Sequence, residues 1–302
     1  MKQISIVLLS LFITFLPGLS FSAGPILVPA WQTEAVFEQA ESVVFDLRRQ
    51  QFYVSNINGH PTEDDADGYI STLSPDGQLL EQHWLTGLNA PKGMIQINDR
   101  LYVADINELV EIDLLSKKII QRYVAPEAKF LNDVAADNKG NVYVSGFLTN
   151  SIYRLSQGKF ELWLQSEQLE VPNGLLVENN QLIVGSWGKM TDGFATAVPG
   201  HIKTIDIATK KITSLGDKSP AGNLDGIEPD NEGNYFVTDW MQGKLLHITP
   251  SGISTTLIVL GQGSADHTVV NKQDILNGQH NLVVIPMMNS NYVTAYKIKE
   301  SP

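Results

Sequence analysis

Six pairs of polar or small residues recur along the chain and carry most of the groups suited to chemistry. They are Glu41-Ser42, Lys92-Gly93, Asn132-Asp133, Asn173-Gly174, Asp225-Gly226 and Asp266-His267. Counted on the sequence, successive pairs lie 51, 40, 41, 52 and 41 positions apart. In five pairs the first residue carries a carboxylate or carboxamide oxygen. Such oxygens, without thiolates or clustered imidazoles, are the ligands that a hard divalent cation prefers.

The pairs therefore predict a cation site if the fold brings them together. Ca²⁺ is the first choice for such oxygen ligands, with Mg²⁺ or Mn²⁺ as alternatives and Zn²⁺ less favoured. Taken singly, Asn173-Gly174 or Asp225-Gly226 is also an ordinary turn former. Glu41 is the strongest candidate, because it precedes the apolar stretch SVVF, where neither a turn nor solubility requires a carboxylate. A metal-free, hydrogen-bonded pore is the alternative.

The elements that must position these pairs are β-strands. After each pair and a short hairpin comes an apolar run rich in β-branched and aromatic residues: FYVSN, LYVAD, VYVSG, LIVGS, YFVTD and LVVIP. We expect these runs to be inner strands. Their period is that of a four-stranded blade, so the sequence predicts an all-β, six-bladed β-propeller. In a propeller the loops converge at one end of a central channel, where the six pairs would form a ring.

The third repeat shows a complete blade, with strands expected over 131–137, 142–147, 151–156 and 159–166. The two long spacings come from insertions at 56–68 and 186–200, which are expected to overhang the channel mouth or to be tolerated surface loops. The last repeat supplies only three strands. The segment 26–38, which belongs to no repeat, is expected to provide the fourth, and this would close the ring without an open edge.

Composition limits the possible compartments and partners. Lys2, an apolar run from Ile4 to Leu16 and the small residues that follow predict a signal peptide over residues 1–23, with export to the periplasm or the medium. Residues 24–302 then form one propeller domain, in which no stretch is apolar enough for a membrane span. The absence of cysteine excludes disulfides and thiol nucleophiles. The formal net charge of −12 argues against nucleic acid as a partner.

The motifs AESVVFD, LND, VPNGL and LDGIEPDNEGNYFVTDW, in this order, resemble the six-bladed calcium-dependent lactonases that include gluconolactonase and senescence marker protein (regucalcin). More distantly, they are similar to strictosidine synthase-like propellers. The resemblance covers essentially the whole chain after the predicted signal peptide. It implies that Glu41, Asn173 and Asp225 hold the metal and that Asn132 contributes to the site.

One departure bears on the substrate. Sugar-lactone hydrolases of this family carry an arginine two residues before the third-blade asparagine, whereas this chain has Phe130 there, preceded by Lys129. A sugar-acid lactone is therefore disfavoured. The predicted substrate contacts are Lys92, Lys129, Trp187, Trp240, Asp266 and His267. Each also has a structural interpretation: a salt bridge for Lys92, packing between blades for the tryptophans, and a structural histidine in place of a pore base for His267.

Hydrolysis of a lactone or ester is the simplest chemistry for such a site. A cation would polarise the carbonyl and activate water, and Asp225 or Asp133 would accept the proton. The alternative is a periplasmic propeller that uses the same metal site to bind a small ligand or a protein without catalysis. A third possibility is a metal-free interaction scaffold. The sequence indicates a small-molecule partner but no oligomeric state.

Overall fold

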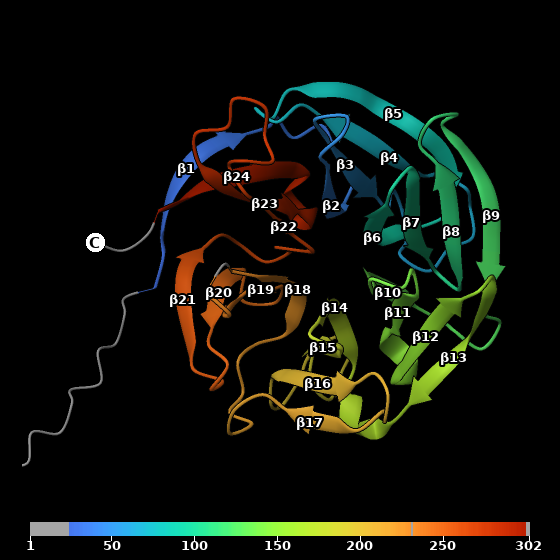
Figure 1. Cartoon of the computed structure of the whole chain (residues 1–302), viewed down its shortest axis with the longest axis vertical. Helices are drawn as coiled ribbons and strands as arrows, with labels where there is room; N and C mark the ends of the chain where they lie inside the picture. Colours follow the sequence, from blue (N-terminus) through green and yellow to red (C-terminus); the bar gives the residue numbers. More distant parts are fainter. Residues whose placement is uncertain (1–23, 231, 300–302) are drawn as a thin grey trace, which may run out of the picture.

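The computed structural model describes residues 24–230 and 232–299. Its strands form six separate four-stranded antiparallel sheets. Figure 1 shows them as blades arranged around a common axis. The predicted six-bladed β-propeller is therefore confirmed. The predicted signal peptide, residues 1–23, lies outside the described residues, and no helix within them is long and apolar enough to cross a membrane.

Blades 1 to 5 are each built from four strands in sequence order, counted outward from the channel. Blade 1 contains β2 (Ala40–Asp46), β3 (Gln51–Asn56), β4 (Gly68–Leu73) and β5 (Leu79–Leu88). Blade 2 contains β6 (Pro91–Ile97), β7 (Arg100–Asp105), β8 (Glu108–Asp113) and β9 (Lys118–Val124). Blade 3 contains β10 (Leu131–Ala136), β11 (Val142–Gly146), β12 (Ser151–Ser156) and β13 (Lys159–Gln165), as expected from the third repeat.

The second half of the chain continues the same pattern. Blade 4 contains β14 (Pro172–Glu178), β15 (Gln181–Ser186), β16 (Ile202–Asp206) and β17 (Ile212–Ser214). Blade 5 contains β18 (Leu224–Pro229), β19 (Tyr235–Asp239), β20 (Lys244–Ile248) and β21 (Ser254–Val259). Blade 6 contains β22 (Thr268–Val270), β23 (Asn281–Met287), β24 (Tyr292–Lys299) and β1 (Ile26–Gln32). The helices of the described residues are three short 3-10 turns: η1 (Phe147–Thr149), η2 (Glu167–Leu169) and η3 (Met288–Ser290).

The ring of blades is closed by the first described strand. β1 pairs antiparallel with β24 and forms the outer edge of blade 6. Figure 1 shows this blue strand beside the red C-terminal strands. The Trp31 indole nitrogen also donates a hydrogen bond to the carbonyl oxygen of Pro75 in blade 1, at 3.1 Å. The predicted closure by the segment before the first repeat is confirmed.

The apolar runs that were expected to be inner strands lie in the inner half of each blade. The runs FYVSN to LVVIP lie in the second strand of each blade, namely β3, β7, β11, β15, β19 and β23. The innermost strands are the preceding ones, which begin one residue before the polar pair in blades 1 to 5 and directly after it in blade 6. Both strands are largely buried, so their composition does not distinguish the first position from the second.

The core consists of apolar clusters between neighbouring blades. Between blades 1 and 2, for example, Tyr53 and Ile70 pack with Leu101 and Val103. Similar clusters join the other neighbouring blades, including blades 6 and 1. Because the inner strands pack on both faces, they carry continuous apolar runs. The blades therefore pack as wedges that fix the ends of the innermost strands around the channel.

Candidate functional site

The polar pairs lie where strand pairing is interrupted in the same way in five blades. In blade 1, Ala40 faces Asn56 and Val43 faces Val54, so β2 carries one residue more than β3 over this stretch. β6, β10, β14 and β18 show the same offset. Such a β-bulge bends a strand and redirects its side chains. The repeated bulge gives the pairs of blades 1 to 5 an orientation that a regular strand would not provide.

Hydroxyl groups of the second strand support three of these bulges. The backbone N–H of Ser42, Asp133 and Gly226 donates to the hydroxyl oxygen of Ser55, Ser145 and Thr238, respectively, at 2.8 to 2.9 Å. A buried N–H without an acceptor would be costly. These bonds therefore satisfy backbone groups that the bulge removes from the ordinary ladder.

Glycines allow the innermost strands to approach one another at this level. A Cβ atom at Gly226 would lie only 2.7 Å from the Asp266 Oδ1 atom and 2.8 Å from its Cα atom. Gly174 and Gly226 belong to β14 and β18, so the alternative interpretation of these pairs as turns is wrong. Between blades 6 and 1, Asp266 N donates to Glu41 O at 2.9 Å. The predicted ring of pairs is thus drawn together by direct contacts between blades.

The four predicted metal ligands are buried, and three of them carry an oxygen without a hydrogen-bond partner among the described residues. Glu41, Asn132, Asn173 and Asp225 are each no more than 5 % exposed. Glu41 Oε2, Asn132 Oδ1 and Asn173 Oδ1 have no hydrogen-bond partner among the described residues. Buried oxygens without partners are rare in folded proteins. This donor set, two carboxylates and two carboxamides, fits a hard divalent cation.

The raised pKa values of the two carboxylates also indicate that a positive charge beside them would be favourable. Burial raises the pKa of Glu41 well above its usual value, and the charges of Asp225 and Asp266 raise it further, against the opposing effect of Lys92. Burial and Asp266 likewise raise the pKa of Asp225, while the Asn173 amide lowers it. A bound cation would reverse both effects. Within the described residues no three acidic or imidazole side chains form a ready metal-binding group, so the amides would have to complete the set.

Asp133 lies deeper and connects two blades. Its Oδ1 atom accepts a hydrogen bond from Val134 N at 2.7 Å, and its Oδ2 atom accepts one from Leu175 N in blade 4 at 2.5 Å. Burial and the charge of Asp266 nevertheless raise its pKa well above the usual value. Both carboxylate oxygens of Asp133 are therefore engaged with the backbone.

Lys92 stands at the ring but makes none of the expected salt bridges among the described residues. Its Nζ atom donates to Ala90 O at 2.8 Å and to Pro61 O at 3.0 Å, and lies 4.5 Å from the centre of the Phe130 ring. Its burial lowers its pKa to about 8, against the opposing charges of Glu41 and Asp105. Because Pro61 belongs to the first insertion, Lys92 holds that loop at the beginning of the innermost strands.

An aromatic cluster occupies the same end of the channel over blades 3 to 5. The Trp187 ring lies 5.4 Å from Phe147, 5.9 Å from Trp240 and 6.1 Å from Phe194, measured between ring centres. Its indole nitrogen donates to Phe194 O at 2.8 Å. Phe130 belongs to the same cluster. The second insertion, which carries Trp187 and Phe194, thus packs its aromatic residues at the channel mouth.

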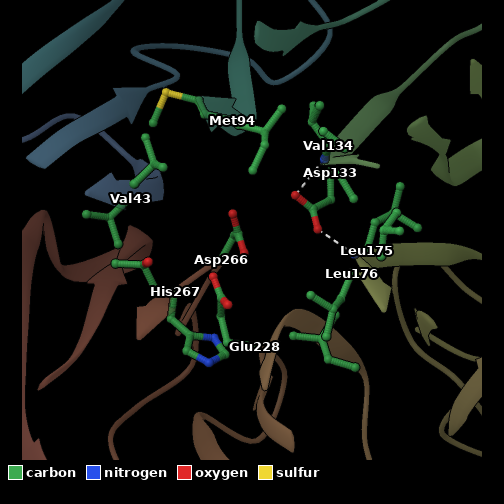
Figure 2. Close-up of a pocket in the computed structure, with 16 residues that line it drawn as sticks. Val43, Met94, Asp133, Val134, Leu175, Leu176, Glu228, Asp266 and His267 are labelled. Carbon is green, nitrogen blue, oxygen red and sulfur yellow. Dashed lines mark hydrogen bonds between the residues drawn. The ribbon is translucent and has the colours of Figure 1, made fainter. Parts of the chain in front are cut away.

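Three predicted substrate contacts lie elsewhere. Lys129 is exposed on the surface. His267 lies further along the channel, where it lines a cavity of about 130 Å³ with Asp133, Asp266 and Glu228 (Figure 2). Burial lowers the pKa of His267 to about 3, so it is a neutral imidazole. The structure therefore brings Lys92, Trp187 and Trp240 to the mouth, and Asp266 and His267 to the interior.

Glu228 is the residue that the sequence analysis missed. It lies within β18, three positions after Asp225, and its carboxylate lines the cavity. Burial and the charge of Asp266 raise its pKa to about 8. The available signal was a carboxylate inside a strand, at a position where the other repeats have apolar residues.

Comparison with known proteins identifies the fold and the family. No curated protein sequence matches the chain closely. Among solved structures, a catalytically inactive virginiamycin B lyase from Staphylococcus aureus with quinupristin has 12 % identity and a TM-score of 0.59, covering 90 % of this chain and 99 % of its own. A luciferin-regenerating enzyme has 16 % identity and a TM-score of 0.58, covering 91 % and 95 %. A chain of a nidogen/laminin complex has 14 % identity and a TM-score of 0.56, covering 73 % and 79 %.

These structural similarities concern the fold alone. The family is shown by a sequence model described as the SMP-30/gluconolactonase/LRE-like region, which matches residues 39–268. The match spans all six polar pairs and most of the propeller. Members of this family are generally lactonase-like hydrolases and usually bind a divalent metal. The chain described here belongs to the SMP-30/gluconolactonase/LRE-like family.

Proposed function

We propose that the protein hydrolyses a lactone or ester with the help of a divalent cation, Ca²⁺ in the first place. Glu41, Asn132, Asn173 and Asp225 would hold it. The observation that carries this proposal is the set of buried, unpartnered oxygens on Glu41, Asn132 and Asn173, at the same position of three blades. When bound, such a cation polarises a carbonyl group and lowers the pKa of a coordinated water.

We assign the proton-accepting role to Asp225. Both carboxylate oxygens of Asp133, the other candidate, accept backbone hydrogen bonds, and one of these bonds connects blades 3 and 4. Asp225 stands in the ring itself, close enough to Asp266 and Glu41 for their charges to interact. Asp133 would then be a positioning residue that fixes the ends of β10 and β14.

The mouth of the channel favours a substrate with apolar parts. Phe130, Phe147, Trp187 and Trp240 gather there, and the ammonium group of Lys92 is engaged with two carbonyl oxygens. An aromatic surface retains apolar groups by removing them from water. We therefore place aliphatic or aromatic lactones and esters ahead of sugar-acid lactones as candidate substrates.

The alternative is a periplasmic propeller that binds a small ligand or protein at the same metal site without catalysis. It is supported by the hydrogen bonds that Lys92 and Asp133 make to backbone groups. Because of these bonds, Asp225 is left as the principal candidate base. The fold does not decide between the two functions. Both require the same cation, and they differ only in turnover.

The test is a screen of aliphatic, aromatic and sugar lactones with the purified protein, after chelation and after readdition of Ca²⁺. We expect Ca²⁺-dependent hydrolysis, and a loss of at least about 100-fold in kcat/KM in Glu41→Gln and Asp225→Asn, because each removes a charge from the ligand set. Glu232→Gln, which changes an exposed carboxylate in blade 5, is the control. Hydrolysis that persists at full rate in Asp225→Asn would contradict the mechanism, whereas ligand binding without turnover would establish the alternative.

A further inference from the structure

The two ends of the propeller differ in charge. Because the strands of a blade alternate in direction, every connecting segment lies either at the end that carries the polar pairs or at the opposite end. Among the described residues, the segments at the opposite end carry six acidic side chains and seven lysines or arginines. Those at the channel mouth carry three lysines and, besides Asp266, eleven acidic side chains: Glu34, Glu38, Glu63, Asp64, Asp65, Asp67, Glu127, Glu167, Glu170, Asp192 and Asp217. The negative charge of the protein therefore gathers on the face that contains the mouth.

The first insertion holds four of these acidic side chains beside the ring. All four are exposed, and none forms an ion pair within the described part of the chain: Glu63, Asp64, Asp65 and Asp67. The loop itself is fixed, because Lys92 Nζ donates to Pro61 O at 3.0 Å and Ala66 N donates to Asn89 Oδ1 at 3.1 Å. Since Lys92 belongs to the ring of polar pairs, these negative charges stay at the mouth.

The aromatic cluster at the same mouth provides a second, independent observation. Phe194 is 45 % exposed and Trp240 is half-buried, so both can meet a ligand. The cluster already contacts one cation, because Lys92 Nζ lies 4.5 Å from the centre of the Phe130 ring. The face of an aromatic ring attracts a cation, and tryptophan does so most strongly. The mouth therefore offers a surface for a ligand that is both apolar and positively charged.

The ring adds a carboxylate without a partner. Glu41 is 5 % exposed, and its Oε2 atom has no hydrogen-bond partner among the described residues. A divalent ion held by the ring would neutralise Glu41 and Asp225, but it would leave the acidic side chains of the surrounding loops ionised. The mouth therefore remains negative with or without that ion. A cleft with one sign of charge raises the local concentration of ligands of the opposite sign.

We infer that the substrate carries a positively charged amine or quaternary ammonium group next to its lactone or ester. This inference rests on the proposed function and specifies the substrate class. The acidic loops attract such a molecule, and Phe194 and Trp240 contact its apolar part and its cationic group. The same loops repel an anionic substrate. Phe130, which stands where sugar-lactone hydrolases carry an arginine, fits this preference because it removes a positive charge from the mouth.

The test compares two esters of the same shape and different charge. These are benzoylcholine and neohexyl benzoate, in which a carbon atom replaces the charged nitrogen. Each kcat/KM, measured with Ca²⁺, is divided by the rate at which hydroxide alone hydrolyses the same ester. At low salt we expect benzoylcholine to be preferred by about 10-fold or more, and added NaCl should reduce this preference because it screens the loops. Equal values, or a preference for the neutral ester, would overturn the inference.

Two triple variants locate the effect on the molecule. The mouth variant combines Glu63→Gln, Asp64→Asn and Asp67→Asn, and should reduce the preference for benzoylcholine by about threefold or more. The control removes the same charge from exposed positions away from the mouth, and should keep the preference: Asp76→Asn, Glu81→Gln and Glu232→Gln. Equal effects of the two variants would mean that only the net charge of the protein matters, and the mouth would not select a cation.

Binding of the two alcohols separates this inference from the proposed function. Choline and its neutral counterpart, neohexyl alcohol, are titrated into the Ca²⁺-loaded protein by calorimetry. If choline binds more tightly, the mouth variant abolishes the difference and neither ester is hydrolysed, the mouth selects a cation and the proposed hydrolysis is refuted. If both esters are hydrolysed at equal normalised rates, the hydrolase stands and this inference is refuted. Absence of both binding and hydrolysis would refute the two together.

Discussion

At the scale of single residues, Gly226 shows what brings the polar pairs together. Its φ angle is not positive, so the backbone conformation does not require glycine. The requirement is space, because the Asp266 backbone and carboxylate lie where a Cβ atom would extend. Gly93 is in the same situation relative to Asp133. The glycines of these pairs therefore allow close packing between blades. The sequence did not indicate this, because Asp-Gly is also a common turn former.

Gly226→Ala should accordingly destabilise the protein by about 1 to 3 kcal/mol, because the added methyl group overpacks the contact between blades 5 and 6. Chemical denaturation measures the effect. Gly185→Ala is a suitable control, since the nearest atom to its added Cβ would be Leu224 Cβ, at 3.3 Å, and a much smaller change is expected there. Equal effects of the two substitutions would show that close approach is not the reason for glycine at position 226.

At the scale of the elements, the β-bulge explains why the sequence predicts the positions of the polar pairs but not the directions of their side chains. The repeat spacing predicts blades, and the polar pairs mark the same position of each blade. An extra residue in β2, β6, β10, β14 and β18 leaves no mark in composition, because it changes pairing and not residue type. Sequence periodicity therefore could not show that Asp133 contacts the backbone of the next blade while Asn132 keeps an unpartnered oxygen.

The hydroxyl behind the bulge of blade 5 offers a test of this element. Thr238 Oγ1 accepts from Gly226 N at 2.9 Å and donates to Ala265 O at 3.0 Å, so it connects blade 5 to the strand segment entering blade 6. Thr238→Val keeps the shape and leaves two buried backbone groups unsatisfied. We expect a loss of about 1 to 3 kcal/mol in the free energy of unfolding.

Thr255→Val, at an exposed position of β21, controls for the general effect of replacing threonine in a strand. It should change stability by no more than about 0.5 kcal/mol. If Thr238→Val is as mild as this control, the hydroxyl does not support the bulge.

At the scale of the whole molecule, the repeat count and the closing strand followed from the sequence because both depend on regular spacing and on the number of strands. Which side chains meet inside the channel could not be predicted from the sequence, because this depends on contacts between distant repeats. Glu228 illustrates this limit: nothing in LDGIEP indicates that its carboxylate meets Asp266, some 40 residues later. Lys129 shows the opposite error. It precedes Phe130 in the sequence and was predicted to contact the substrate, but it is exposed on the surface.

The carboxylates that line the channel also make the stability of the whole propeller depend on pH. In the folded protein the pKa of Asp266 is raised to about 7 and that of Glu228 to about 8. Between their ordinary values and these, the folded state holds more protons than the unfolded state, so the free energy of unfolding falls as pH rises. His267 acts in the opposite direction, mainly below its ordinary pKa of 6.5, because well above it the imidazole is neutral in both states.

The window from pH 6.5 to 8 is therefore governed by the channel carboxylates, and Lys92, whose pKa is lowered to about 8, opposes them only towards its upper end. In this window the melting temperature of the chelated protein should fall as pH rises, whereas with saturating Ca²⁺ the fall should be absent, because the cation replaces the protons as the partner of the ionised carboxylates. Glu228→Leu should show a shallower fall when chelated, since it removes one of the carboxylates whose pKa lies in this range. A chelated protein whose melting temperature stays constant or rises between these pH values would mean that the channel carboxylates are already neutralised within the protein, and the physical reason for placing a cation on its axis would be lost.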